Sequence, residues 1–194
     1  MTRYGWRGWL VHLALAIGLG WIAPAGADPR APLIWAFGDS LAAGYGLPPD
    51  RGFTAQLQAA LRRQGVAATV RNGGVAGDTA AQGRARLRWG LRGLPVAQAR
   101  ANLDQILAEL ARRRIPILLV GMRAAPNLGP DYARAFEGMY PALARAYRVP
   151  LYPFFLEGVA ANRALIQRDG LHPNARGVSI IVERILPAVR RALH

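Results

Sequence analysis

Residues 32–47 read PLIWAFGDSLAAGYGL, and this stretch decides the fold. The apolar run Pro32–Phe37 predicts a short buried strand, and Gly38-Asp39-Ser40 predicts the tight turn that follows it. A serine on a strand-to-helix turn is exposed, and its own backbone N–H can point toward a bound oxyanion. Taken alone, a Gly-Asp-Ser sequence is more often an ordinary turn with a capping serine, so its meaning depends on the rest of the chain.

Strand and helix patterns alternate after this stretch. The expected helices are Phe53–Gln64, Thr79–Trp89, Val96–Arg113, Asp131–Tyr147 and Ala175–Leu193, and the further expected strands are Val66–Val70, Ile115–Val120 and Val149–Tyr152, with a loop at Asn72-Gly73-Gly74. Such alternation predicts parallel strands joined by right-handed crossovers, in a single α/β domain of three layers. Ligands of these sheets bind at the carboxyl ends of the strands.

Two further motifs are GGVAGDT at residues 73–79, after the second expected strand, and DGLHPN at residues 169–174, near the carboxyl end of the chain. Glycines let backbone N–H groups approach a ligand closely. Asp169 and His172, three residues apart on a turn fixed by Gly and Pro, can place the carboxylate on the imidazole, which can then take a proton from a serine. A lone D-x-x-H pair is more often a surface pair, but the order Ser, Asp, His in an α/β chain is much more specific.

These three motifs resemble the first, second and last sequence blocks of the SGNH hydrolases, also called GDSL esterases/lipases. The likeness is strongest to the bacterial periplasmic arylesterase, thioesterase and lysophospholipase subgroup, and it implies a flavodoxin-like parallel sheet. The resemblance implies that Ser40 is the nucleophile, His172 the general base and acid, and Asp169 the residue that orients the imidazole. It also implies oxyanion donors at the backbone N–H groups of Ser40 and Gly77, with Asn127 near the acyl pocket.

The family pattern has one more block, G-x-N-D, at the end of the central strand, where the Asn side chain is a third oxyanion donor. No such block and no strand-like run lies between Gly83 and Pro95. Comparison with the family pattern therefore predicts a deletion of roughly eighteen residues near 88–90. The sheet is expected to lack its central strand, which exposes strand edges and apolar surface. Asn72, which begins the second block, and Asn102, within an expected helix, are not obvious substitutes.

The leading hypothesis is a serine hydrolase that cleaves aryl esters, short-acyl esters, thioesters or lysophospholipids through an acyl-enzyme. Its partner is thus a small-molecule ester or lysolipid substrate. The alternative is a catalytically impaired or inactive homologue that binds acyl or lipid ligands, because loss of one oxyanion donor costs about 10²–10³ in rate. A third hypothesis, flavodoxin-like nucleotide binding, is weak because Gly73–Gly77 does not form G-x-G-x-x-G and no P-loop Lys exists.

Residues 1–27 have the layout of a secretory signal peptide. Arg3 and Arg7 form a positive region, the stretch Trp9–Ala23 is almost entirely apolar, and an A-x-A pattern ends at Ala27. We expect cleavage after Ala27, a mature domain at 28–194, and a periplasmic or secreted protein with no stable membrane anchor after cleavage. An uncleaved anchor is the alternative, but the apolar run is shorter than the roughly 20 residues of a membrane span.

Composition excludes several other classes. With 52% hydrophobic and 19% charged residues, the 194-residue chain can bury a core and is not globally disordered. The absence of Cys excludes disulfide scaffolds, thiolate metal sites and a Cys nucleophile. The net charge of +14 comes entirely from scattered Arg, densest at expected helix ends, so nucleic-acid binding is not expected. Because His12 lies in the expected signal and His194 is the last residue, His172 is the one usable His, and neither a metal nor a cofactor is implied.

Overall fold

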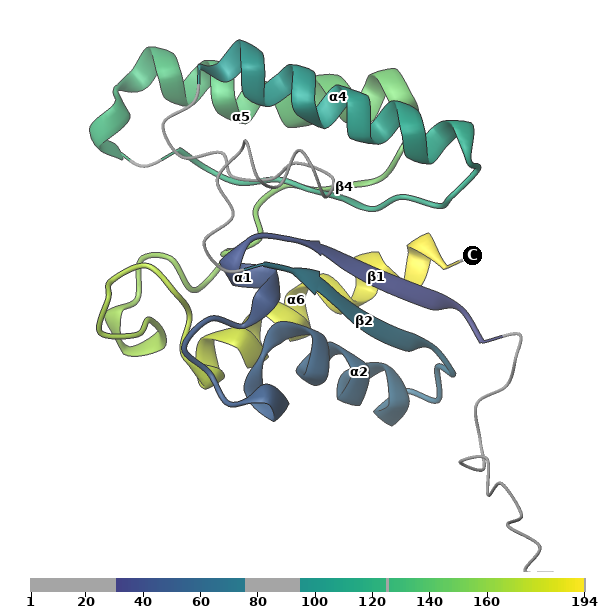
Figure 1. The fold of residues 1–194 in the computed structure, drawn as a ribbon. Coiled ribbons are helices and arrows are strands. Elements are labelled where there is room, and N and C mark those ends of the chain that lie inside the picture. The colour runs from purple at the N-terminus through teal and green to yellow at the C-terminus, as the bar shows by residue number, and fades with distance from the viewer. Residues whose placement is uncertain (1–30, 76–94, 125, 194) are drawn as a thin grey trace, which may run out of the picture.

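A computed structural model describes residues 31–75, 95–124 and 126–193 (Figure 1). The elements are, in chain order, β1 (Leu33–Gly38), α1 (Ser40–Ala43), the 3₁₀ turn η1 (Pro49–Arg51), α2 (Phe53–Arg63), β2 (Thr69–Gly74), α4 (Val96–Arg112), β3 (Leu119–Val120), the 3₁₀ turn η2 (Pro126–Leu128), α5 (Pro130–Tyr147), β4 (Leu151–Tyr152), the 3₁₀ turn η3 (Arg163–Leu165) and α6 (Ala175–Ala192). The predicted alternation of strands and helices is confirmed. The expected helix Thr79–Trp89 and the deletion near 88–90 lie outside the described residues.

The four strands form two parallel pairs. β1 pairs with β2, from Leu33 opposite Thr69 to Gly38 opposite Gly74, and β3 pairs with β4. Within the described ranges, no strand joins the pair β1–β2 to the pair β3–β4. The parallel α/β architecture is therefore as predicted, and the arrangement agrees with a sheet that lacks its central strand.

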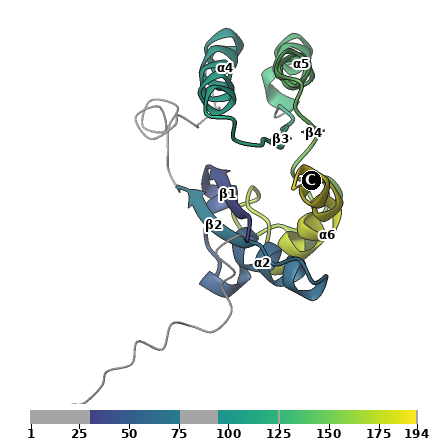
Figure 2. The same cartoon turned by 90° about the vertical axis from the view of Figure 1, so that its right-hand side faces the viewer.

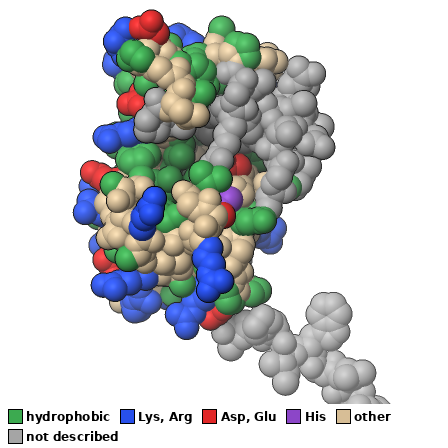
Figure 3. Space-filling view, turned by 90° about the vertical axis from the view of Figure 1, so that its left-hand side faces the viewer, with side chains coloured by type: hydrophobic (Ala, Val, Ile, Leu, Met, Phe, Trp, Pro, Cys, Tyr) green, Lys and Arg blue, Asp and Glu red, His purple; other side chains and the backbone are tan. Residues whose placement is uncertain are grey.

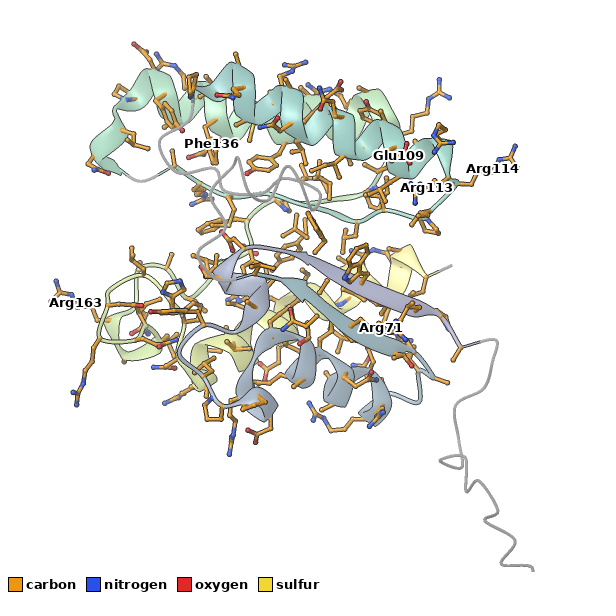
Figure 4. All side chains as sticks on the ribbon, in the orientation of Figure 1. Arg71, Glu109, Arg113, Arg114, Phe136 and Arg163 are labelled. Atoms are coloured by element: carbon orange, nitrogen blue, oxygen red, sulfur yellow. The ribbon has the colours of Figure 1, made fainter. Side chains whose placement is uncertain are left out.

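The helices form layers on either side of the strands (Figure 2). On one side, α2 and α6 pack together over a core that also takes in Tyr152 of β4 and the half-buried Ile34 and Ala36 of β1. On the other side, α4 and α5 pack on the β3–β4 pair, and Phe136 points from α5 toward the strands (Figure 4). The three-layer prediction holds, with a separate hydrophobic cluster on each side of the strands.

The outer face of β1 is apolar and exposed. Side chains alternate between the two faces of a strand, so Ile34 and Ala36 face the core while Leu33 and Trp35 point the other way. Leu33 is 57% exposed and Trp35 is 56% exposed. The cluster of α4 and α5 packs against residues of the other strand pair, such as Leu119, and does not include β1. The expected exposure of apolar surface is present at this face.

The second strand differs from its prediction. The strand is Thr69–Gly74, whereas Val66–Val70 was expected to be the strand and Asn72–Gly74 a loop. The residues Asn72–Gly74 pair in register with Ala36–Gly38 of β1, and this tertiary pairing overrides the turn preference of the Asn-Gly-Gly sequence. The loop prediction was therefore wrong.

The later strands are shorter than predicted. β3 begins at Leu119, although the apolar run begins at Ile115, and Ile115 is 45% exposed. β4 is limited to Leu151–Tyr152, although Val149 was expected to begin it. Because pairing with each other is the only ladder these strands have within the described residues, regular strand geometry extends over only two residues of each. The prediction of a strand over the whole of Ile115–Val120 was wrong.

The long helices begin and end close to their predicted bounds. In α2, Phe53, Leu57, Ala60 and Leu61 are buried at the helical spacing that predicted the helix. In α4, Glu109 accepts hydrogen bonds from Arg112 and Arg113 at the carboxyl end (Figure 4), and these bonds lower the pKa of Glu109 to about 2. No helix in the described part of the chain is sufficiently long and apolar to span a membrane.

Truncation of Leu61 tests the packing between α2 and α6. Leu61 is fully buried, so Leu61→Ala is expected to lower the free energy of unfolding by about 2–5 kcal/mol in urea unfolding. The matched substitution Leu33→Ala, on the exposed face of β1, is expected to change it by less than about 0.5 kcal/mol. Equal losses for the two variants would show that β1 is covered on both faces in solution.

Candidate active site

Ser40 begins the short helix α1 directly after β1. Asp39 is the N-cap residue, and its Oδ1 accepts a hydrogen bond from the backbone N–H of Leu41 at 2.9 Å. The helix ends after one turn at Gly44, which has a φ of 79°. The Gly-Asp-Ser sequence therefore acts locally as a capped helix start, and it also carries the serine to the carboxyl end of the strand.

Gly74 and Asn72, at the end of β2, hold α1 against the strands. A Cβ on Gly74 would lie 2.2 Å from the backbone nitrogen of Ala43, so only glycine allows this close approach. Asn72 accepts a hydrogen bond from the N–H of Gly74 at 2.9 Å and donates one to the carbonyl of Ala43 at 3.2 Å. The second motif thus positions α1 through Gly74, whereas its glycines were expected to approach a ligand.

A tight turn fixes His172 relative to Asp169. Oδ1 of Asp169 accepts hydrogen bonds from the backbone N–H of Leu171 at 2.9 Å and of His172 at 3.0 Å. Oδ2 of Asp169 lies 2.6 Å from Nδ1 of His172. These backbone bonds, followed by the side-chain bond to His172, lower the pKa of Asp169 to about 2. Asp169 is therefore a carboxylate at any physiological pH.

The other ring nitrogen of His172 faces Ser40. Nε2 of His172 lies 2.8 Å from Oγ of Ser40, across 132 positions of sequence. A carboxylate at Nδ1 favours the tautomer in which Nδ1–H donates to Asp169, which leaves Nε2 free to accept from the serine hydroxyl. The side chain of His172 is 14% exposed. Figure 3 shows a small patch in the colour of histidine at the surface of this face of the molecule. The structure thus brings the three predicted catalytic side chains into one hydrogen-bonded chain.

The remaining predicted site residues do not join this chain of hydrogen bonds. Gly77 lies outside the described residues. Asn127 is exposed on η2, after β3. Asn102 is buried on α4, and the amide nitrogen of Asn72 already donates to Ala43. That neither Asn72 nor Asn102 replaces the third oxyanion donor stays a prediction.

The structure also reveals a ring that the sequence did not single out. The Tyr45 ring lies against the imidazole of His172, with 4.7 Å between centroids. Tyr45 is 52% exposed, and Leu171, the residue before His172, is 47% exposed. Tyr45 lies five residues after Ser40, and only the fold shows that it contacts the histidine. The described residues contain no group of three or more His, Cys, Asp or Glu that could hold a metal ion.

Comparisons with known proteins identify relatives over most of the chain. The model of the "GDSL-like Lipase/Acylhydrolase family" matches residues 36–180. "Esterase TesA" of Pseudomonas aeruginosa is 34% identical over 174 residues, covering 80% of this chain and 87% of the relative. "Thioesterase 1/protease 1/lysophospholipase L1" of Escherichia coli K12 is 36% identical, covering 71% and 73%. The crystal structure of "AlinE4, a SGNH-hydrolase family esterase" has a TM-score of 0.68 at 47% identity, covering 86% and 99%.

The coverage of these alignments supports the missing block. The alignment with Esterase TesA spans 174 residues, yet 80% of this 194-residue chain is about 155 residues. About 19 positions of the relative, the difference between 174 and 155, therefore have no counterpart here. This difference is close to the length of the predicted deletion.

The lowered pKa of Asp169 predicts a specific acid response. Its folded pKa of about 2 lies below the ordinary 3.8, so the carboxylate stabilises the folded state above pH 3.8, and this contribution is lost as the pH falls toward 2. In urea unfolding between pH 5 and pH 2, Asp169→Asn is expected to be less stable than the unsubstituted protein at pH 5, with the difference shrinking toward pH 2. A difference that stays constant over this range would contradict the assigned hydrogen bonds.

Proposed function

The chain belongs to the GDSL-like lipase/acylhydrolase family, and from that premise we propose that it hydrolyses carboxylic esters through an acyl-enzyme on Ser40. The observation that carries the proposal is the continuous relay from Ser40 through His172 to Asp169, with contacts of 2.8 and 2.6 Å. This arrangement supplies a nucleophile, a base within hydrogen-bond reach of it, and a third group that orients the base.

The reaction proceeds in two halves. Nε2 of His172 takes the proton of the Ser40 hydroxyl while Oγ attacks the carbonyl carbon of the ester. The tetrahedral intermediate collapses, and the alcohol or thiol leaves with the proton from His172. Water then loses a proton to His172 and attacks the acyl carbon, and the carboxylic acid leaves as Oγ regains the proton. Asp169 remains a carboxylate throughout and stabilises the charged imidazole.

Oxyanion stabilisation is the weakest part of this machinery. We assign the backbone N–H groups of Ser40 and Gly77 as donors, by the same family resemblance. The third donor, the Asn of the missing block, has no substitute at Asn72 or Asn102. Loss of one donor costs about 10²–10³ in rate, so turnover is expected to be slow but measurable.

The substrates fit an exposed apolar rim. The ring of Tyr45, which packs on His172, and the side chain of Leu171, the residue before His172, are each about half exposed and offer apolar surface to an acyl or aryl group. Asn127 is assigned near the acyl pocket by resemblance. We therefore propose aryl esters, short-acyl esters, thioesters or lysophospholipids as substrates, with no cofactor. The names of the Pseudomonas and Escherichia relatives, an esterase and a thioesterase/lysophospholipase, support this range.

The second candidate function is binding without turnover. It is favoured by the two strand pairs, which no described strand joins, and by the absent third donor. In that case the protein binds acyl or lipid ligands at the same residues. A folded chain that binds a fatty acid in calorimetry but does not hydrolyse an activated ester would establish this function.

Ester turnover beside a serine variant tests the proposal. The purified protein is expected to hydrolyse p-nitrophenyl acetate and butyrate, and Ser40→Ala is expected to abolish this turnover because it removes the hydroxyl that contacts Nε2 of His172. Circular dichroism of Ser40→Ala should match that of the unsubstituted protein. Turnover retained at the original rate in Ser40→Ala would exclude the assigned nucleophile.

The pH dependence of turnover tests the base. With a pKa of about 2, Asp169 stays ionised between pH 8 and pH 5, so a change of rate over this range does not come from its carboxylate. Turnover is expected to fall below about pH 6–7, where histidines ordinarily gain a proton. A rate that stays flat to about pH 4 would contradict a histidine base.

We further propose that residues 1–27 are a signal peptide, that 28–194 form one mature domain, and that the protein is periplasmic or secreted. Support comes from the basic, apolar and A-x-A regions of the leader. Amino-terminal sequencing of the exported protein is expected to begin at Asp28. An intact Met1 on membrane-bound protein would show that the segment remains as an anchor.

A further inference from the structure

We propose that the side-chain amide of Gln167 is a brace that sets the distance between Ser40 and His172. It is a positioning residue, and its kinetic consequence rests on the proposed ester hydrolysis. No contact of Gln167 with substrate is needed for this role. The reason lies in how the two reacting side chains are carried on separate segments of the chain.

Each segment is internally fixed. In the nucleophile segment, residues 38–47, the carbonyl of Ser40 accepts hydrogen bonds from the N–H groups of Gly44 at 3.1 Å and Tyr45 at 3.0 Å. In the base loop, residues 166–174, the carbonyl of His172 accepts from the N–H of Gln167 at 2.7 Å, and Asp169 holds the turn. These bonds shape each segment, but none of them fixes one segment relative to the other.

Gln167 joins the two segments directly. Its Nε2 donates to the carbonyl of Tyr45 at 2.8 Å in the nucleophile segment, and to the carbonyl of Pro173 at 2.9 Å in the base loop. The amide therefore donates one hydrogen to the nucleophile segment and the other to the base loop. The acceptor in the nucleophile segment lies 122 positions away in sequence, and the acceptor in the base loop is the residue next to His172.

The acceptor at Tyr45 lies next to the reacting groups. The ring of this residue packs on the imidazole of His172, and its backbone N–H bonds back to Ser40. A displacement of the Tyr45 carbonyl thus moves the ring that covers the base and the turn that carries the nucleophile. The hydrogen bonds of Asp169 to described residues, by contrast, stay within its own loop, so they do not set the distance from His172 to Ser40.

The nucleophile segment is shaped around this amide. Gly46 has a φ of 72°, a conformation that side-chain-bearing residues rarely adopt. A Cβ at Gly46 would also lie 2.2 Å from Oε1 of Gln167, so any side chain there would displace the amide. Glycine at position 46 is thus required both by the backbone and by the brace.

Replacement of Gln167 by Met tests the brace, because Met has a similar length and no hydrogen-bond donor. We expect kcat for p-nitrophenyl butyrate to fall about 10- to 100-fold, since a misplacement of about 1 Å can cost about 10²-fold in rate. KM is expected to change less than about twofold, because no substrate contact is removed. Gln167→Glu keeps the shape of the side chain and loses both donor hydrogens, so it is expected to show the same fall in kcat. It replaces Gln167→Met in this test if the Met variant does not fold.

Gln58 provides the matched control. Its amide also makes two backbone hydrogen bonds, to the carbonyl of Ala68 at 2.6 Å and from the N–H of Val70 at 2.7 Å, beside the amino-terminal end of β2. That end of the strand is opposite to the site. Gln58→Met is expected to lower the thermal midpoint as Gln167→Met does, while kcat stays within about twofold. Equal falls of kcat in both variants, or an unchanged kcat in Gln167→Met, would overturn the brace.

A crystal structure of Gln167→Met separates the brace from the proposed activity. The distance between Oγ of Ser40 and Nε2 of His172, 2.8 Å with Gln167 present, is expected to exceed about 3.5 Å, the limit of a hydrogen bond. An unchanged distance overturns the brace whatever the kinetics show. If the unsubstituted protein has no turnover, the ester hydrolase proposal fails, and this distance still decides the role of Gln167.

Discussion

The hydrogen bond between Oγ of Ser40 and Nε2 of His172 is the contact on which the proposed chemistry depends, and one hydrophobic core supports both ends of it. The core of α2 and α6 takes in Leu41 and Leu47 beside the nucleophile, and Leu165 and Ile166 beside the base loop. Asn174, the last residue of that loop, caps α6. Ser40 and His172 therefore share one packed unit, and their alignment does not require a strand between β1 and β3.

The separation of the strands into two pairs affects the stability of the molecule and its tendency to associate. The cluster of α4 and α5 packs on β3 and β4, and it leaves Leu33 and Trp35 of β1 exposed. An exposed apolar strand face contributes little to stability and invites association with other chains. Under the proposed function, the G-x-N-D block that the sequence lacks would have supplied an oxyanion donor. We therefore propose a protein that keeps the hydrogen-bonded chain from Ser40 to Asp169 and has weaker charge stabilisation in the transition state.

Prediction from the sequence was most successful where the chemistry is local. Asp169 and His172 lie three residues apart, and the apolar residues of α2 have helical spacing, so the Asp–His pair and this helix could both be predicted from the sequence. The bounds of β2 were not, because pairing with β1 draws Asn72-Gly73-Gly74 into the strand against their turn preference. Tyr45 and Gln167 carry no local signal, since their contacts join positions that only the fold brings together.

Labelling of the nucleophile tests the relay most directly. The purified protein is incubated with a fluorophosphonate, whose phosphorus bonds to an activated serine Oγ as fluoride leaves and the serine proton passes to the base. Intact mass and peptide mapping are predicted to show a single adduct on the peptide that contains Ser40, and no adduct in His172→Ala. A folded protein that remains unlabelled, or an adduct on a different residue, would contradict a working Ser40–His172–Asp169 relay in a chain without the central strand.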